Sequence, residues 1–155
     1  MSAARSEAAE RVEELLQRIL DAVGIEAEVS ITEDENAVTA TLDGEDLGLL
    51  IGRHGQTIDA IQHLAYRAAF RGADSRKRVT VDAAGYRDRR AALLQHDADE
   101  AADEALRIGA PVALDAMNAV ERRVVHEYLR DREGVETYSE GAEPDRHLVV
   151  APSKR

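Results

Sequence analysis

The spacing of apolar residues in this chain changes several times, and each change marks a new predicted element. Across residues 5–23, apolar side chains recur every three or four positions, which predicts an amphipathic helix that ends at Gly24. Its expected core face is Val12, Leu15, Leu16, Ile19 and Val23. Residues 27–32 and 37–42 have the pattern of strands, with a polar turn at 33–36 between them. The chain is therefore predicted to begin with a helix followed by two strands.

Helical spacing then returns on both sides of a short turn. The turn consists of residues 51–55, and the apolar run 47–50 precedes it. Residues 56–70 follow it as a second, longer helix. The apolar face of that helix is Ile58, Ile61, Ala65 and Ala68. Residues 78–82 alternate apolar and polar positions, which predicts a third strand.

A second group of elements begins after residues 83–85, where we predict a boundary between two small domains, 1–84 and 85–155. This junction is too short to be a flexible linker, so a stiff connection is expected. Residues 86–108 are predicted to form one long helix. Its expected inner face is Leu94, Ala98, Ala101 and Ala105. Its acidic run, residues 97–104, is expected to be solvated.

The rest of the chain is predicted to contain a short strand, a helix and two strands. A Gly-Ala-Pro sequence breaks the long helix, and residues 111–114 have the pattern of the short strand. Asn118 and Glu121 have the spacing of a capping box, which predicts a helix from there to about Arg132. The last two strands are expected at residues 135–139 and 146–151. Both groups together predict an α+β protein.

Composition narrows the classes of function. The 155 residues include no cysteine, which excludes disulfides, a thiolate nucleophile and a cysteine zinc site. The polar N-terminal residues do not resemble a signal peptide, and no apolar run approaches the roughly 20 residues needed to span a bilayer. We therefore expect a cytoplasmic protein that is not inserted in a membrane.

The formal net charge of −11 is unevenly distributed. Residues 1–46 contain 3 basic and 13 acidic side chains, whereas residues 47–78 contain 6 basic and 2 acidic ones. The second segment is thus a basic island of net +4 (6 − 2) around the turn. The acidic stretch is best explained as a solvated surface that aids solubility. Because acidic flanks weaken the attraction to phosphates, we expect modest affinity for any nucleic acid.

The turn within the basic island has the composition of a clamp for a nucleic-acid backbone. Gly52 and Gly55 permit a sharp turn and a close approach, and Arg53 and His54 supply cationic or hydrogen-bonding groups between them. The next helix begins here, so its free N–H groups also point to this turn. For this motif alone, an ordinary helix-helix turn is the alternative. The order of the flanking elements favours the nucleic-acid interpretation.

A row of cationic side chains follows the same helix. His63, Arg67 and Arg71 recur at every fourth position, which places them on one side of it. Arg67 and Arg71 are candidates for additional RNA contacts. A solvated helix edge is an equal alternative for this row.

A second cationic row lies on the later helix. Arg122 and His126 are one turn apart on the same face, and Arg130 extends that row. Without an acidic partner in the row, these side chains are expected to contact phosphate oxygens or bases. Surface salt-bridging is the alternative, and it suits Arg123, which has Glu127 four residues on. The opposite side of the helix is expected to be core: Val120, Val124, Val125, Tyr128 and Leu129.

These motifs resemble a known family. The first group of elements has the order of a bacterial-type (type II) KH domain, α-β-β-α-α-β, with Gly52–Gly55 as its Gly-x-x-Gly clamp. Residues 117–126, 137–141 and 146–152 resemble the R-3-H domain of the bacterial Jag/KhpB family. Residues 85–90 resemble the junction that follows the KH domain in that family. The resemblance extends over nearly the whole chain.

The resemblance implies a non-catalytic protein that binds single-stranded RNA, with residues 52–55 as the clamp and with Arg122 and His126 as contacts in the second domain. It also implies a role in cell elongation, division or envelope homeostasis, and a partnership with a small KH-only protein. Many family members begin with an additional N-terminal domain and a long linker. This sequence is expected to be a short form without them.

Other functions remain alternatives. In a protein-interaction adaptor, the KH surface and the acidic first helix would serve dimerisation or docking. Salt discriminates the two, because RNA affinity falls steeply as salt rises and apolar docking does not. No enzyme is expected, because the sequence has no His-Glu-x-x-His, phosphate-loop lysine motif or nucleophile elbow. The five histidines are too scattered for a metal site, and neither a cofactor nor a small-molecule substrate is expected. Double-stranded RNA and single-stranded DNA remain alternative ligands.

Overall fold

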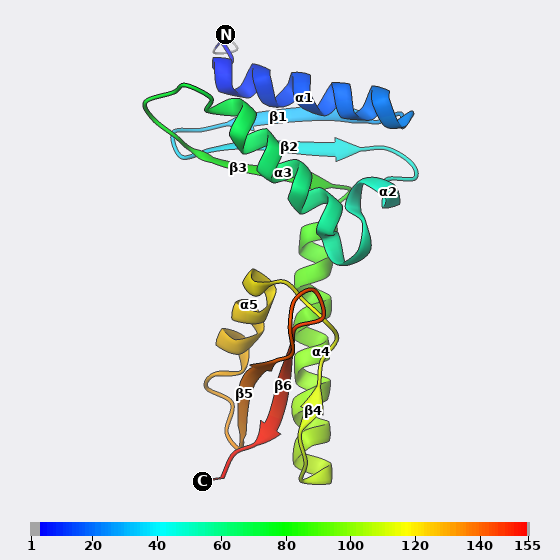
Figure 1. The fold of residues 1–155 in the computed structure, drawn as a ribbon, viewed down its shortest axis with the longest axis vertical. Helices are drawn as coiled ribbons and strands as arrows, with labels where there is room; N and C mark the ends of the chain where they lie inside the picture. The colour runs from blue at the N-terminus through cyan, green and yellow to red at the C-terminus, as the bar shows by residue number, and fades with distance from the viewer. Residues whose placement is uncertain (1–3, 155) are drawn as a thin grey trace. The chain divides into compact units, whose positions relative to one another are not determined.

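The computed structural model describes residues 4–154 and contains two compact units (Figure 1). Unit 1 ends at Arg87 and unit 2 begins at Asp88, three residues beyond the boundary expected from the sequence. Helices and strands occur in both units, so the predicted α+β class is confirmed. Within the described residues, no helix has the length and apolar character needed to cross a bilayer.

Unit 1 contains one three-stranded sheet covered by helices. Its elements are α1 (Glu7–Val23), β1 (Glu28–Glu33), β2 (Ala37–Asp43), α2 (Gly48–Ile51), the short 3-10 helix η1 (Arg53–Gly55), α3 (Gln56–Ala69) and β3 (Arg78–Ala83). β2 is central, antiparallel to β1 and parallel to β3. α1 and α3 lie side by side on one face of the sheet (Figure 1). Each element lies within two residues of its predicted position.

The core face of α1 differs in part from the prediction. The buried residues of this helix are Ala9, Val12, Leu16 and Leu20. Leu15 and Ile19 are only partly buried, and Val23 is 45% exposed. A helix that packs on one layer buries a narrow stripe, and the apolar arc of α1 is wider than that stripe. Gly24 ends the helix as predicted, with a left-handed φ of 72°.

Unit 2 contains a second three-stranded sheet with two helices. Its elements are α4 (Tyr86–Ile108), which begins in unit 1, then β4 (Val112–Ala113), α5 (Ala119–Leu129), β5 (Val135–Glu140) and β6 (His147–Pro152). β6 is central and antiparallel to both neighbours. The predicted inner face of α4 is confirmed, because all four residues are buried. The capping box is also confirmed: the Asn118 side chain accepts from the Glu121 N–H at 2.8 Å, and the Glu121 carboxylate accepts from the Asn118 N–H at 3.3 Å.

The orientation of α5 about its own axis was predicted wrongly. Val125 and Leu129 are buried as expected, and Arg122, expected to be exposed, is only 8% exposed. Three residues predicted to be core are exposed: Val120, Val124 and Tyr128. Valines occur on more than one side of this short helix, so its apolar periodicity does not define a single inner face. Arg122 can lie on the inner face because it pairs with Glu143, which belongs to the loop between β5 and β6.

The acidic run of α4 is also more than a solvated surface. Asp99 accepts a hydrogen bond from the Tyr128 hydroxyl at 2.8 Å, and this contact raises the pKa of Tyr128. Arg132, just after α5, pairs with Asp99 at 3.4 Å and with Asp103. These contacts hold the end of α5 against α4. Because the partners are about 30 residues apart, helical spacing cannot reveal them.

Candidate nucleic-acid interface

The turn between α2 and α3 follows a path that requires glycine at two positions. Gly52 and Gly55 have φ of +73° and +75°, and His54 between them has φ of 56°. A Cβ on Gly52 would lie 2.7 Å from the Cβ of Thr57, and one on Gly55 would lie 2.6 Å from the hydroxyl oxygen of Tyr86. Both backbone conformation and space therefore exclude larger residues at the two glycines.

The residues between the glycines face an uncapped helix end. Arg53 is exposed and His54 is half-buried, and neither side chain has a hydrogen bond or ion pair with another residue of 4–154. α3 begins at Gln56 without a side-chain cap, and the Gln56 N–H donates to the Arg53 carbonyl. The positive end of the helix dipole therefore lies beside Arg53 with no side-chain acceptor on it. The turn thus combines a free guanidinium, an imidazole and a helix N-terminus. This combination suits the oxygens of a phosphate.

Apolar and cationic side chains extend the surface beside this turn. Leu49 on α2 is 66% exposed, and Leu64 on α3 is 54% exposed. Both are large apolar groups left in water, which suit the faces of unstacked bases. His63, Arg67 and Arg71 are all exposed at or just beyond α3, as the spacing predicted.

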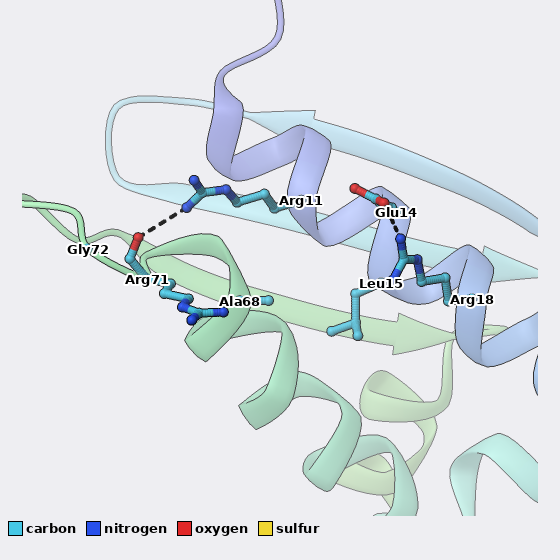
Figure 2. Close-up of a pocket in the computed structure, with 7 residues that line it drawn as sticks. All are labelled: Arg11, Glu14, Leu15, Arg18, Ala68, Arg71 and Gly72. Carbon is cyan, nitrogen blue, oxygen red and sulfur yellow. Dashed lines mark hydrogen bonds and ion pairs between the residues drawn. The ribbon is translucent and has the colours of Figure 1, made fainter.

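A cavity of about 650 Å³ lies between α1 and the C-terminal end of α3 (Figure 2). Arg11 donates to the backbone carbonyl of Arg71 at 3.2 Å, and Arg18 pairs with Glu14 at 2.8 Å. The two α1 arginines are therefore engaged within unit 1. The guanidinium of Arg71 has no partner among the described residues, so it is the cation of this cavity that remains available.

Hydrogen bonds fix the start of α3 against β3. The Arg87 guanidinium donates to the carbonyl of Val81 at 3.0 Å, to Asp59 at 2.9 Å and to the Gln62 side-chain oxygen at 2.9 Å. The same Gln62 oxygen accepts from the Val81 N–H at 3.0 Å. This network holds in place the helix whose N-terminus faces the glycine turn.

A second candidate surface, in unit 2, is a cavity of about 400 Å³ between α5 and the β5–β6 hairpin. Nine residues line it: Ala119, Arg122, Arg123, His126, Thr137, Tyr138, Ser139, Arg146 and Leu148. None of the nine is acidic, although the whole chain carries a formal charge of −11. The cavity is therefore a local concentration of positive charge.

Arg122 lies in this cavity in a setting that the sequence did not predict. Its side chain is 10% exposed, and its guanidinium donates to the Met117 carbonyl at 2.5 Å and to Glu143 at 2.8 Å. Its helical row contains no acidic residue, as expected, but Glu143 reaches it from the β5–β6 loop. The prediction that Arg122 is an exposed cation is therefore wrong. It is a buried cation that ties this loop to α5. Spacing along one helix cannot show a partner on another element.

The other cations of α5 and its C-terminal end, His126, Arg123 and Arg130, differ in the contacts they make. His126 is exposed, and its Nδ1 shares a hydrogen bond with the Thr137 hydroxyl. The salt bridge suggested for Arg123 is absent from the described residues, where Glu127 pairs with Arg130 at 3.5 Å. Arg130 follows the end of α5, does not line the cavity and is 68% exposed.

Sequence reasoning selected Arg122 and His126 and did not select the other seven residues that line the cavity, among them Arg123, Thr137, Ser139 and Arg146. The alternation of β5 was the available signal for Thr137 and Ser139, because residues two apart on a strand share one face. Arg146 precedes β6 in a loop, and no periodicity indicates where a loop residue points.

Comparisons with known protein families match both units. Residues 9–82 match the family described as "KhpA/KhpB, KH domain", and residues 92–152 match the R-3-H domain family. The first match spans α1 to β3 with the glycine turn, and the second spans most of α4 to the end of β6. Each match therefore contains one of the two candidate surfaces.

Curated relatives cover most of the chain. It is similar to proteins named "RNA-binding protein KhpB" from Clostridium symbiosum (34% identical over 140 residues), Lactiplantibacillus plantarum (37% over 139) and Bacillus subtilis (35% over 138). These alignments cover 89%, 90% and 88% of this chain, and 63%, 43% and 66% of the respective relatives. The chain thus spans between about two fifths and two thirds of the length of the relatives it matches.

Proposed function

Because this chain belongs to the Jag/KhpB family, with a KH domain followed by an R-3-H domain, we propose that it binds single-stranded RNA and catalyses no reaction. Family membership confirms the resemblance seen in the sequence. The observation that carries the proposal is the glycine turn at 52–55, which places a free guanidinium beside an uncapped helix N-terminus. The relatives are named as RNA-binding proteins, which supports RNA as the ligand.

In the proposed complex, unit 1 clamps the nucleotide backbone. Gly52 and Gly55 allow the sugar-phosphate chain to approach the protein backbone, while Arg53 and His54 contact phosphate oxygens. Bases lie beside the exposed leucine side chains that flank the turn.

Other cations add contacts in this proposal. Arg67 and Arg71 extend the phosphate path along α3, because both are exposed at that end of the unit. The face of unit 2 around Arg122 and His126 supplies a second contact, with Arg130 at its edge. Two weak contacts on one chain bind a single RNA more tightly than either does alone.

The test is fluorescence anisotropy with labelled single-stranded RNA at two salt concentrations. The variant Arg53→Asp/His54→Asp is compared with Arg107→Asp/His96→Asp, which makes the same charge change on exposed side chains of α4. We expect the clamp variant to weaken binding more than about tenfold, and the wild-type affinity to fall steeply with salt. The control should stay within about threefold of the wild type.

Other outcomes would change the proposal. Equal losses in the two variants would show that net charge, rather than the clamp, governs binding. No RNA binding at low salt would favour the adaptor function, in which the exposed leucines beside the turn dock a protein. Double-stranded RNA and single-stranded DNA of the same sequence are included, and tighter binding to either would replace single-stranded RNA as the ligand.

The cellular role is proposed on the same family premise. We propose that the protein acts in the cytoplasm in cell elongation, division or envelope homeostasis, together with a small KH-only protein. Complementation of a bacterial strain that lacks its own KhpB tests the role, with cell length and width as the readout. Rescue by the wild type and not by the clamp variant would link the role to RNA. Co-purification of the KH-only protein with the tagged chain tests the partnership.

A further inference from the structure

We propose that a groove at the C-terminal end of α3 is a docking site for an acidic segment of another protein. This α1–α3 groove is formed by Leu15 on α1, by Ala68 near the end of α3, and by the exposed arginines Arg67, Arg71 and Arg76. The segment that fits it carries both carboxylates and apolar side chains. The inference concerns a protein partner, so it goes beyond the proposed binding of RNA at the glycine turn.

Two adjoining cavities make up the groove. The first, of about 650 Å³, lies between the two helices, and Figure 2 shows Leu15 and Ala68 among its lining residues. The second, of about 440 Å³, is lined by Tyr66, Arg67, Ala68, Phe70, Arg71, Gly72 and Arg76. Because Ala68, Arg71 and Gly72 line both cavities, the groove continues around the end of α3. A continuous groove suits a polypeptide segment, whose successive side chains can enter one cavity after the other.

The free positive charge of the groove lies in the second cavity. None of the residues that line this cavity is acidic, although the chain carries a formal net charge of −11. The guanidiniums of Arg67, Arg71 and Arg76 have no partner among residues 4–154. An arginine can donate two parallel hydrogen bonds to one carboxylate. Three free guanidiniums around one cavity therefore favour a partner with several carboxylates.

The helix C-terminus alone does not explain this cluster. Arg67 lies in the last turn of α3 and Arg71 just beyond it, where the helix dipole favours a cation. Arg76 belongs to the loop before β3, and it nevertheless lines the same cavity. The dipole thus accounts for two of the three arginines at most.

The first cavity is better suited to a polypeptide than to a nucleic acid. Leu15 and Ala68 are partly buried and contribute apolar surface to it. Glu14 also lines it, and pairs with Arg18 at 2.8 Å. α1 as a whole carries five acidic and two basic side chains, so a row of phosphates along it would be repelled. A protein segment can place its carboxylates at the free arginines and its apolar side chains against Leu15.

The groove and the glycine turn lie at opposite ends of α3. This helix has 14 residues. At about 1.5 Å per residue it is about 21 Å long, so a segment docked at its C-terminal end leaves the turn uncovered. The segment does engage Arg67 and Arg71, which are proposed to extend the phosphate path of RNA. It should therefore compete with a long RNA for these two arginines, but not with a short RNA at the turn.

The first experiment selects peptides from a random library displayed on phage, with the full chain as the target. Phage that also bind the variant Arg67→Gln/Arg71→Gln/Arg76→Gln are removed before each round. All three side chains are exposed, so this variant should keep the fold, which its NMR spectrum checks. We expect the retained peptides to combine aspartate or glutamate with large apolar residues. No enrichment, or retained peptides without carboxylates, would overturn the proposal.

The second experiment measures the affinity of one retained peptide. Arg71→Gln and Arg76→Gln should each weaken its binding about tenfold, because each removes a charge-assisted hydrogen-bond donor. Ala68→Gln keeps the net charge and fills the junction of the two cavities, so it should weaken binding as well. The matched control Arg107→Gln, an exposed arginine of α4, should stay within about twofold of the wild type. An equal loss in this control, or full binding by Ala68→Gln, would overturn the proposal.

Competition with RNA separates this inference from the RNA-binding function. The peptide should leave the affinity for an RNA of about four nucleotides unchanged, and should weaken binding of a longer RNA about two- to fivefold. If peptide binding depends on Arg53 and His54 instead of Arg71 and Arg76, the groove is overturned and RNA binding stands. If the peptide binds as described and no RNA binds at low salt, the RNA-binding function is overturned and the groove stands. If the short RNA displaces the peptide and itself requires Arg71 and Arg76, these arginines belong to the RNA surface and the docking site is overturned.

Discussion

Gly55 is the residue of the clamp with the least freedom to change. Its φ of +75° disfavours any L side chain, and a Cβ there would lie 2.6–2.7 Å from the hydroxyl oxygen and a ring carbon of Tyr86. We expect Gly55→Ala to lower the free energy of unfolding of unit 1 by about 2–5 kcal/mol, the sum of left-handed strain and overpacking.

Gly24→Ala is the matched control for this prediction. Gly24 has a similar φ of +72° with no atom within 4 Å of the added Cβ, so only the strain of about 1–2 kcal/mol is expected. Chemical denaturation followed by residue-resolved NMR measures the free energy of unfolding of unit 1 separately from that of unit 2. Equal destabilisation by the two substitutions would show that Tyr86 moves aside at no cost.

Arg122 and Arg123 are adjacent, and we expect their substitutions to have opposite consequences. Arg122→Ala should lower the free energy of unfolding of unit 2 by about 1–3 kcal/mol, because it leaves a buried carbonyl without its donor and breaks the pair with Glu143. Arg123→Gln should change stability by less than about 0.5 kcal/mol, because Arg123 is exposed. Denaturation of both variants checks this, and an Arg122→Ala protein as stable as the wild type would contradict a structural role for the contacts with Met117 and Glu143.

At the scale of elements, the start of α1 is tied to the end of β1 by one carboxylate. The Ser6 side chain caps α1 by accepting from the Ala9 N–H at 3.1 Å, and its hydroxyl donates to Glu33 at 2.5 Å. Lys77 also donates to Glu33, at 3.3 Å. The hydrogen bond from the Ser6 hydroxyl is the main cause that lowers the pKa of Glu33 below its ordinary value.

A pH dependence follows from this lowered pKa. The folded protein favours the carboxylate, so the stabilisation is complete above the ordinary glutamate pKa and is lost as the pH falls through the lowered one. We expect Glu33→Gln to cost up to about 1 kcal/mol at neutral pH and almost nothing at acidic pH. Amide hydrogen exchange of α1 at both pH values measures the difference. A constant difference across the pH range would contradict it.

Elements were predictable where the periodicity has one interpretation. The four predicted inner-face residues of α4 and the capping box at Asn118 follow from sequence spacing, because both depend on neighbours within one helix. The inner face of α5 does not, because its valines are spread around the helix. Its orientation depends on the pairing of Arg122 with Glu143, 21 residues away in the sequence. Such long-range ion pairs determine which side of a short helix can be buried.

At the scale of the whole molecule, the order of elements and the glycine turn were sufficient to indicate a KH domain, and the motifs at residues 85–90, 117–126, 137–141 and 146–152 indicated the family. The contents of the unit 2 cavity were not predictable, because α5, β5 and the loop with Arg146 contribute to it together. Helical spacing drew attention to Arg122 and His126, and it gave no reason to select Arg123 or Arg146.

The combined action of the two units is testable through RNA length. A Gly-x-x-Gly loop clamps about four nucleotides, so the affinity for an RNA of that length should depend mainly on unit 1. The double variant Arg123→Gln/Arg146→Gln removes two arginines that line the unit 2 cavity beside Arg122 and His126. It should therefore weaken binding to long RNA about tenfold, and to the short RNA less than about twofold. Anisotropy with the two lengths checks this. Equal effects at both lengths would mean that the two units do not act on the same RNA molecule.

The separation of charge along unit 1 has a kinetic consequence. Residues 1–46, which include α1, β1 and β2, hold ten more acidic than basic side chains, whereas the segment from α2 to the start of β3 carries a net +4. An approaching polyanion is repelled by the first set and attracted by the second, so productive collisions are selected by orientation before any contact forms. Ionic strength should accordingly act mainly on the association rate, while the lifetime of the bound state is set by the short-range contacts at the turn.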